Sequence, residues 1–348
     1  MEPPPESPRD TPSVADAAAE FLSLIGLKEL EWCLFAETLA VVAVGAPPRD
    51  KAEGQWWMAA QWAPYQREGE PVQSCILVQT RFRGKRDGVP ASSSLKAYVT
   101  WQLETLEQEE QERLELRPHP TEKTTHIVSH QHGMTVTKTL QEGEAEPQCH
   151  SFSYSRAKLR ARLLEGASLL LLRVLARRQT MPPDLVFPAI NSEGDLCTCS
   201  YSALGIQRQA VGSAETEVFV IERAVHASTG ATAVWHSSFL PSGRLAQLMQ
   251  IGSPVLMLLQ DESILSKSGR FEPQLPFPKE PLDWEEDMEL YSYFLDRKAL
   301  LLQQPHDTIS FAAEFFAHQR PIGTPFASTG AASPLPSSPA GHPPANSK

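Results

Sequence analysis

One stretch of the chain reads Leu185-Val-Phe-Pro-Ala-Ile190, then Asn191-Ser-Glu-Gly194, then, after Asp195, Leu196-Cys-Thr-Cys-Ser-Tyr-Ser202. Both flanking runs are rich in apolar and β-forming residues, and the segment between them has the composition of a turn. A connection this short obliges the two strands to run antiparallel. The sequence therefore predicts a β-hairpin here, and the hairpin sets the fold class of its surroundings.

The same pattern continues toward residue 260. Further turns are predicted at Ser228-Thr-Gly230 and Pro241-Ser-Gly243, because such stretches favour tight reversals of the chain. The additional strands predicted in this half are Gln207–Val211, Glu217–His226, Thr232–Leu240, Leu245–Ile251 and Val255–Leu259.

The N-terminal half also contains mainly strand patterns. A helix is predicted over Asp16–Leu30, loosening at Gly26, and a second over Ser94–Glu112, where apolar residues recur at three- and four-residue steps after three serines. The strands predicted here are Cys33–Val44, Trp56–Pro64, Ser74–Phe82, Thr124–Ser129 and Thr135–Leu140, the last two forming a hairpin.

Residues Arg156–Arg178 have the clearest helical pattern of the chain. Leucines, alanine and valine form a wide apolar stripe, and arginines such as Arg160, Arg173 and Arg177 lie off it. Such a helix either lies on an anionic membrane or packs against a sheet while its arginines extend to solvent. We expect the second arrangement.

These elements predict an α+β fold with a long, curved antiparallel sheet packed around a central helix, because strands come in meanders with helices between them. Short C-terminal helices and disordered termini complete it. The predicted parts are a disordered arm (1–13), a β-rich α+β domain (14–262), a Pro-rich linker (263–283), a helical docking segment (284–317) and a disordered tail (318–348).

Composition narrows the function. The 348 residues carry a formal charge of −11, which argues against a nucleic-acid binder, since that function needs a basic surface. No secretory signal is visible, and no apolar run is long enough to span a bilayer. The 5 cysteines are scattered, which suits a reducing compartment.

No catalytic motif is found, and neither a metal nor a cofactor is predicted. His126, His130 and His132 suggest a metal site at first, but no nearby cysteine or carboxylate completes a ligand set. Cys197 and Cys199 share one face of a strand, and we expect them to be two packed thiols rather than a redox or metal pair.

The C-terminal part contains two segments with apolar helical faces. In Trp284–Lys298 that face consists of Met288, Tyr291 and Leu295, and in the later segment Pro305 precedes a short helix with an apolar stripe. A helix this short cannot bury the stripe alone, so it must dock. The predicted docking surface is Leu301, Leu302, Pro305, Ile309, Phe311, Phe315 and Phe316, together with Met288, Tyr291 and Leu295.

The later segment resembles the end of the dimerisation-docking module of cAMP-dependent protein kinase regulatory subunits and their ciliary relatives. In that module two helices per chain pair into a four-helix dimer whose groove accepts an amphipathic anchoring helix. Lys298 is followed almost at once by Leu300–Leu302, whereas the family resemblance described next implies an extra helical stretch between these two runs. We therefore expect docking at this segment rather than dimerisation.

A broader resemblance rests on runs spread over most of the chain. The sequence is similar to the family of ciliogenesis-associated proteins that bind a tetratricopeptide-repeat partner. The runs that carry this likeness are Ala15–Phe21, Phe35-Ala-Glu-Thr-Leu39, Leu172-Arg-Val-Leu-Ala176, Glu217-Val-Phe-Val-Ile-Glu222, Gly243-Arg-Leu-Ala246, Gln250-Ile-Gly-Ser-Pro254, Trp284–Lys298 and Thr308–Phe316.

The resemblance implies a non-enzymatic scaffold that promotes actin polymerisation and organisation during primary cilium assembly. It implies as partners a tetratricopeptide-repeat protein and, directly or indirectly, the actin cytoskeleton. It also implies pools in the cytoplasm, cytoskeleton and nucleus and at the inner face of the plasma membrane. Two other functions stay open: a carrier of a lipid or other apolar ligand within the curved sheet, and, ranked last, an enzyme.

Overall fold

A computed structural model describes residues 13–45, 52–67, 69–86, 88–212, 214–261 and 263–266. The described residues all belong to one compact unit, Met1–Pro273. The predicted docking segment (284–317), the predicted tail (318–348) and most of the predicted arm and linker lie outside them.

A single antiparallel sheet of 14 strands makes up most of the described chain. Its order is β8-β7-β6-β5-β4-β3-β2-β1-β14-β13-β12-β11-β10-β9, so that β1 pairs with both β2 and β14. The strands are β1 (Ala36–Ala43), β2 (Gly54–Tyr65), β3 (Gln73–Arg86), β4 (Val89–Val99), β5 (Thr105–Leu114), β6 (Thr121–His130), β7 (Gly133–Glu142), β8 (Gln148–Ser155), β9 (Leu185–Ile190), β10 (Leu196–Val211), β11 (Ala214–Ala227), β12 (Thr232–Phe239), β13 (Leu245–Gln250) and β14 (Val255–Leu258).

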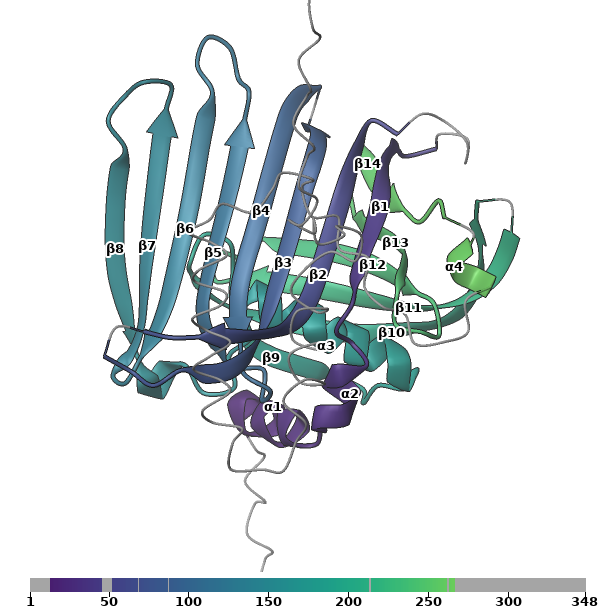
Figure 1. The fold of residues 1–348 in the computed structure, drawn as a ribbon, viewed down its shortest axis with the longest axis horizontal. Helices are drawn as coiled ribbons and strands as arrows, with labels where there is room; N and C mark the ends of the chain where they lie inside the picture. The colour runs from purple at the N-terminus through teal and green to yellow at the C-terminus, as the bar shows by residue number, and fades with distance from the viewer. Residues whose placement is uncertain are drawn as a thin grey trace, which may run out of the picture. The chain divides into compact units, whose positions relative to one another are not determined.

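The sheet folds back on itself, as Figure 1 shows. Strands β1 to β8 stand side by side in one layer, and β9 to β13 cross behind them at a steep angle. The helices are α1 (Val14–Ser23), α2 (Leu27–Glu31), α3 (Glu165–Arg178) and α4 (Ser263–Ser266), with a 3-10 turn at Arg156–Lys158. α4 lies at the start of the predicted 263–283 linker.

The predicted Leu185–Ser202 hairpin is confirmed. Ile190 pairs with Leu196 and Leu185 with Tyr201, so β9 and β10 run antiparallel on either side of the predicted turn. The expected loosening of the N-terminal helix at Gly26 is also confirmed, because Gly26 separates α1 from α2 as the N-cap of α2. β10 merges the two strands predicted at Leu196–Ser202 and Gln207–Val211, with a register shift between Ala203 and Gly205.

The predicted helix over Ser94–Glu112 is wrong, because this segment forms parts of β4 and β5. Leu95, Ala97 and Val99 are all buried, and a two-residue period is the mark of a strand. The same apolar residues also fit a three- and four-residue step, and tertiary packing decided between the two patterns. Strand β8 was not predicted at all.

The α+β class with a sheet packed around a central helix also requires correction, since the fold is a large antiparallel sheet with a few short helices. α3 packs mainly against β3, β4, β5 and β11, and it contacts α2. In Figure 1 it lies near the end of the layers where α1 and α2 are found, and it does not run through the whole sheet. The domain is therefore more β than α+β.

The environment of α3 overturns the prediction that its arginines all extend to solvent. Every residue from Gly166 to Ala176 except the half-buried Leu169 is buried, Arg173 included. A helix surrounded in this way leaves no free apolar face for a membrane surface. No helix among the described residues is long and apolar enough to cross a membrane.

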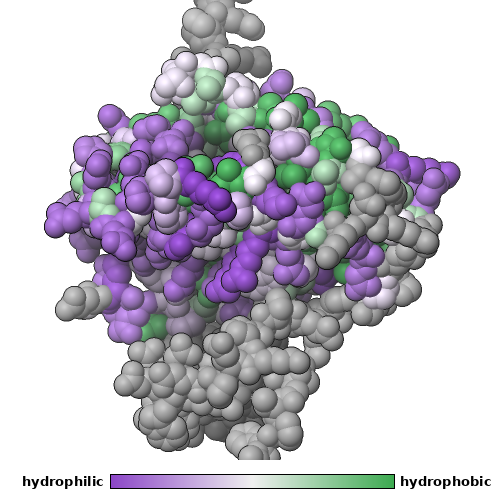
Figure 2. All heavy atoms as spheres, turned by 90° about the horizontal axis from the view of Figure 1, so that it is seen from above, coloured by the Kyte–Doolittle hydropathy of each residue, from purple (hydrophilic) through white to green (hydrophobic). Residues whose placement is uncertain are grey.

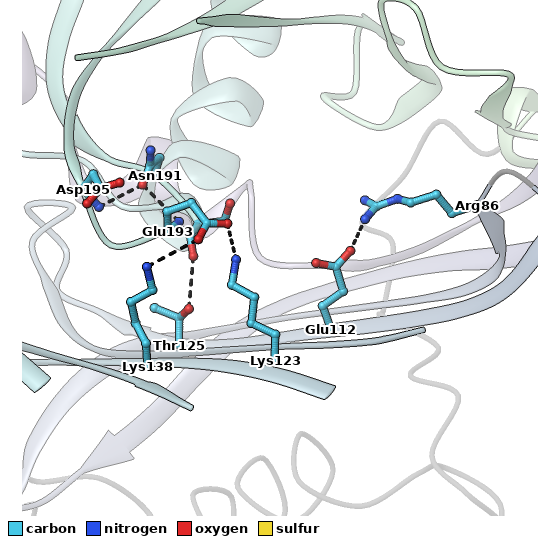
Figure 3. A network of polar contacts seen from close by, with 9 residues as sticks. Arg86, Glu112, Lys123, Thr125, Lys138, Asn191, Glu193 and Asp195 are labelled. Atoms are coloured by element: carbon cyan, nitrogen blue, oxygen red, sulfur yellow. Dashed lines mark hydrogen bonds and ion pairs between the residues drawn. The ribbon is translucent and has the colours of Figure 1, made fainter. Parts of the chain in front are cut away.

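The turn between β9 and β10 connects the two ends of the folded sheet. Figure 3 shows Lys123 of β6 and Lys138 of β7 reaching Glu193 of this turn. Thr125 donates a hydrogen bond to the Ser192 carbonyl at 3.1 Å, and Tyr154 of β8 donates to the Gly194 carbonyl at 3.0 Å. A small apolar core lies beneath, formed by Ile127, Met134, Val136, Leu164 and Ile190.

Candidate functional site

The two layers of the sheet and one face of α3 enclose a cleft of about 260 Å³, which we call the apolar chamber. Its helical face carries Leu169 and Leu172. On the face of the domain that is seen from above, apolar side chains gather between hydrophilic ones (Figure 2). A mostly apolar concave site with a few polar groups is the usual form of a small-molecule site. The other apolar lining residues are Trp56, Met58, Phe82, Trp235, Phe239, Leu245, Leu248, Pro254, Val255 and Met257.

A buried ion pair lies at one end of this chamber. Arg173 of α3 donates to Glu37 of β1 at 2.6 Å, and the two side chains are 1% and 2% exposed. Arg173 also donates to the carbonyls of Cys33 and Phe35 at 2.8 and 2.9 Å. The second oxygen of Glu37 accepts the backbone N–H of Leu245 at 2.9 Å. This pair therefore joins α3 to β1 and to the start of β13.

A second ion pair lies at the N-terminal end of α3. Arg223 of β11 donates to both carboxylate oxygens of Glu165, at 2.8 and 2.5 Å. Burial disfavours the charged form of Arg223, but the neighbouring Glu165 carboxylate, together with Cys199 and Tyr201, outweighs this effect and raises the pKa of Arg223 well above its usual value. The side chain of Gln108, from β5, accepts the Gly166 N–H at 2.9 Å and so caps the helix.

A polar chamber of about 480 Å³ adjoins the apolar one, and both are lined by Arg86, Glu165 and Arg223. Glu110 of β5 faces the polar chamber, and its carboxylate accepts a hydrogen bond from Gln108 at 2.7 Å. Burial raises the pKa of Glu110 to about 7, with the nearby Glu165 adding to the effect. Glu110 therefore changes its protonation state near neutral pH.

Two polar groups that line the apolar chamber lack hydrogen-bond partners among the described residues. They are the hydroxyl of Ser237 on β12 and the Nε–H of Arg173. Each of these residues is only 1% exposed. Buried polar groups are nearly always hydrogen-bonded, so these two mark the place where the chamber can satisfy a hydrogen-bonding ligand.

The predicted docking residues, from Met288 to Phe316, all lie outside the described residues. The histidines considered as metal ligands have other partners: His126 contacts Glu107 at 2.8 Å, and His130 contacts Thr135 at 3.2 Å. The rings of His130 and His132 lie 6.3 Å apart. Over the described ranges, no group of three or more side chains is placed to hold a metal ion.

Cys197 and Cys199 are both buried free thiols on β10, as expected for packed thiols. Burial raises the pKa of Cys197 to about 11, so this thiol stays protonated. Tyr201 shares a hydrogen bond of 2.5 Å with Ser168, and burial raises the Tyr201 pKa well above its usual value. Cys197 and Tyr201 therefore both stay protonated at neutral pH.

Sequence reasoning missed the residues that line the cleft. One signal was available, because Arg173 stands inside the apolar run Leu169–Ala176, where a buried charge needs a partner. Its partner Glu37 lies far away in the chain and could not be identified. Ser237 gave no signal, since a serine in a strand is ordinary.

Comparisons with known proteins place the chain in a family. A family model described as "Ciliogenesis-associated TTC17-interacting protein, N-terminal domain" matches residues 17–254. A Xenopus laevis protein named "Ciliogenesis-associated TTC17-interacting protein" is 36% identical over 353 residues, covering 93% of this chain and 92% of the relative. A Homo sapiens protein of the same name is 33% identical over 331 residues, covering 88% of this chain and 84% of the relative.

A solved structure also aligns with the chain. It is described as a beta-barrel-like protein of domain of unknown function DUF1849 from Brucella abortus, with a TM-score of 0.35 and 7% identity over 65% of this chain and 94% of that one. A likeness at this level does not establish a shared fold. The matches to the family model and to the two relatives cover most of the sequence, and by them this chain belongs to the family of ciliogenesis-associated TTC17-interacting proteins.

Proposed function

We propose that this protein binds TTC17, the tetratricopeptide-repeat protein after which its relatives are named, and that it acts as a scaffold in cilium assembly. The observation that carries the proposal is the 36% identity to a relative with this name over 93% of the chain. The likeness extends over nearly the whole length of both proteins, and this supports a partner in common.

The contact with TTC17 is assigned to the C-terminal docking segment, residues 284–317. Its apolar residues, such as Ile309, Phe315 and Phe316, recur at helical spacing beside acidic residues. Tetratricopeptide repeats stack helix pairs into a superhelix with an extended concave binding surface, and an amphipathic helix is a suitable ligand for such a groove.

Actin polymerisation and organisation are the downstream process that we assign to this complex. The protein is expected in the cytoplasm and cytoskeleton, with further pools in the nucleus and at the inner face of the plasma membrane. We assign it no catalytic role, and its effect on actin, direct or indirect, would follow from bringing other proteins together.

A co-precipitation experiment in ciliated cells tests the proposal. The full chain is expected to retain TTC17, deletion of residues 284–317 should abolish retention, and deletion of residues 318–348 should leave it unchanged. The second deletion is the control, because it removes a similar length of Pro- and Ser-rich sequence without the apolar stripe.

Retention that survives deletion of 284–317 would overturn the assigned surface. Failure of the full chain to retain TTC17 would overturn the proposed function. Actin filament content, compared in cells expressing the full chain and the 284–317 deletion, tests the downstream process separately.

A further inference from the structure

We propose that the apolar chamber binds a neutral single-chain lipid whose oxygen-bearing head meets Ser237 and Arg173. This site lies in the β domain, whereas the proposed TTC17 contact is assigned to residues 284–317. The argument rests on the shape of the walls, on the charges at the two ends of the chamber and on the two unpartnered polar groups inside it.

The walls fit a hydrocarbon chain. One side is the α3 face that carries Leu169 and Leu172, and the other sides come from the two sheet layers, with Trp56, Met58 and Met257 among their lining residues. Methionine side chains are flexible and polarisable, so they adapt to ligands without a fixed shape. Covering these walls with an alkyl chain would remove apolar surface from water, which is favourable.

The buried charges in the chamber are already neutralised. Arg173 is paired with Glu37 at 2.6 Å, and Arg223 is paired with Glu165 at 2.8 and 2.5 Å. A charged head group would therefore be a buried charge without a counter-charge, which is strongly unfavourable. The chamber favours an uncharged head.

The unpartnered groups specify what that head must contain. The Arg173 Nε–H can only donate a hydrogen bond, and the Ser237 hydroxyl can donate or accept one. An oxygen with free lone pairs can accept a hydrogen bond from either group, and an alcohol can in addition donate to Ser237. A long-chain alcohol or a neutral ester matches these requirements, whereas a plain hydrocarbon leaves the two groups unsatisfied.

Lys85 and Arg86 line the outer part of the chamber and are exposed. Arg86 forms an ion pair with Glu112, so only part of this positive charge is available to a ligand. A fatty acid whose carboxylate meets Lys85 is therefore the alternative occupant, and the test must distinguish an acid from an alcohol of the same chain.

Two fluorescent lipids with the same polyene chain make that distinction: parinaric alcohol and parinaric acid. Each is titrated into the purified full chain at neutral pH, and binding is followed by polyene emission and by energy transfer from tryptophan, since Trp56 and Trp235 line the chamber. We expect saturable binding of both lipids or of the alcohol alone, with at least fivefold tighter binding of the alcohol.

Three variants localise the binding. Leu169→Trp should weaken binding of the alcohol at least tenfold by filling the chamber, and Ser237→Ala should weaken it about fivefold, the effect of one hydrogen bond. Ile206→Trp is the control: it adds the same side chain at a position that is 60% exposed and outside the chamber lining, so affinity should not change. Circular dichroism and a thermal melt confirm that each variant is folded.

Three results would overturn the inference. Tighter binding of the acid than of the alcohol would show that the chamber prefers an anionic ligand to a neutral one. Unchanged affinity in folded Leu169→Trp and Ser237→Ala would place the binding elsewhere. Absence of binding by both lipids would mean that water alone satisfies Ser237 and Arg173.

Discussion

The ionisation of Glu110 makes the stability of the folded domain depend on pH. Its carboxyl group faces the polar chamber, where burial raises its pKa to about 7, against a reference value of 4.5. The folded protein therefore holds a proton on Glu110 at pH values where the unfolded chain has released it. The resulting contribution to stability is fully present below about pH 4.5 and is lost as the pH rises through 7.

Replacing Glu110 by glutamine should raise stability above pH 7, because glutamine cannot ionise and still accepts the Gln108 hydrogen bond. The gain is expected to be roughly 1 to 3 kcal/mol above pH 7 and to vanish below about pH 5. Thermal melts of the two proteins between pH 4.5 and 8.5 measure it. Glu109→Gln is the control, since Glu109 is the exposed neighbour on the other face of β5. A pH-independent difference between Glu110→Gln and the parent protein would contradict the assignment.

At the scale of single elements, the hairpins were predictable from sequence and the Ser94–Glu112 segment was not. The β9–β10 hairpin is a local event, set by two apolar runs and a turn of fixed length. In β4 and β5 the local pattern allows both helix and strand, and the choice depends on the partners β3 and β6, which contribute strand pairing from outside the segment. The cleft was less predictable still, because its walls come from strands and a helix that are distant in the chain.

The turn between β9 and β10 is the element whose packing is most easily tested. Gly194 has a φ of +75°, and an added Cβ would meet Val136 Cγ1 of β7 at 2.6 Å. Gly230, in the turn between β11 and β12, has a φ of +88° and nothing within 4 Å of an added Cβ. The two glycines share the backbone conformation and differ in their surroundings.

We expect Gly194→Ala to destabilise the domain more than Gly230→Ala, by about 1 to 3 kcal/mol, because both carry the backbone strain but only the first overpacks a core. Urea denaturation of both variants gives the difference. Equal losses of unfolding free energy in the two variants would show that the β9–β10 turn shifts to accommodate the added methyl group without disturbing β7.

At the scale of the whole molecule, the Glu37–Arg173 pair holds distant parts of the chain together. It links α3, from the middle of the sequence, to β1 near the beginning and to β13 near the end. Arg173 and Arg244 also stack on Phe35, at 3.8 and 4.4 Å from its ring centroid. The two halves of the sheet are thus joined through the Glu37–Arg173 ion pair.

Replacing Arg173 by methionine leaves the Glu37 carboxylate buried without its cation, and such losses typically cost about 3 to 5 kcal/mol. The measurement is the free energy of unfolding from urea denaturation. Arg160→Met is the control, because Arg160 pairs with Asp16 at the surface, where ion pairs contribute little. A loss in Arg173→Met no larger than that in the control would show that Glu37 finds another partner or a proton.

The pairing of β1 with β14 has a practical consequence for where this domain can be cut. The family match ends at residue 254, one position before β14 begins at Val255. β14 pairs with β1 on one side and with β13 on the other, and Val255 and Met257 also line the apolar chamber. A fragment trimmed to the match would expose two bare strand edges, which invite aggregation. The autonomous folding unit therefore extends past the match, at least through the buried Leu259.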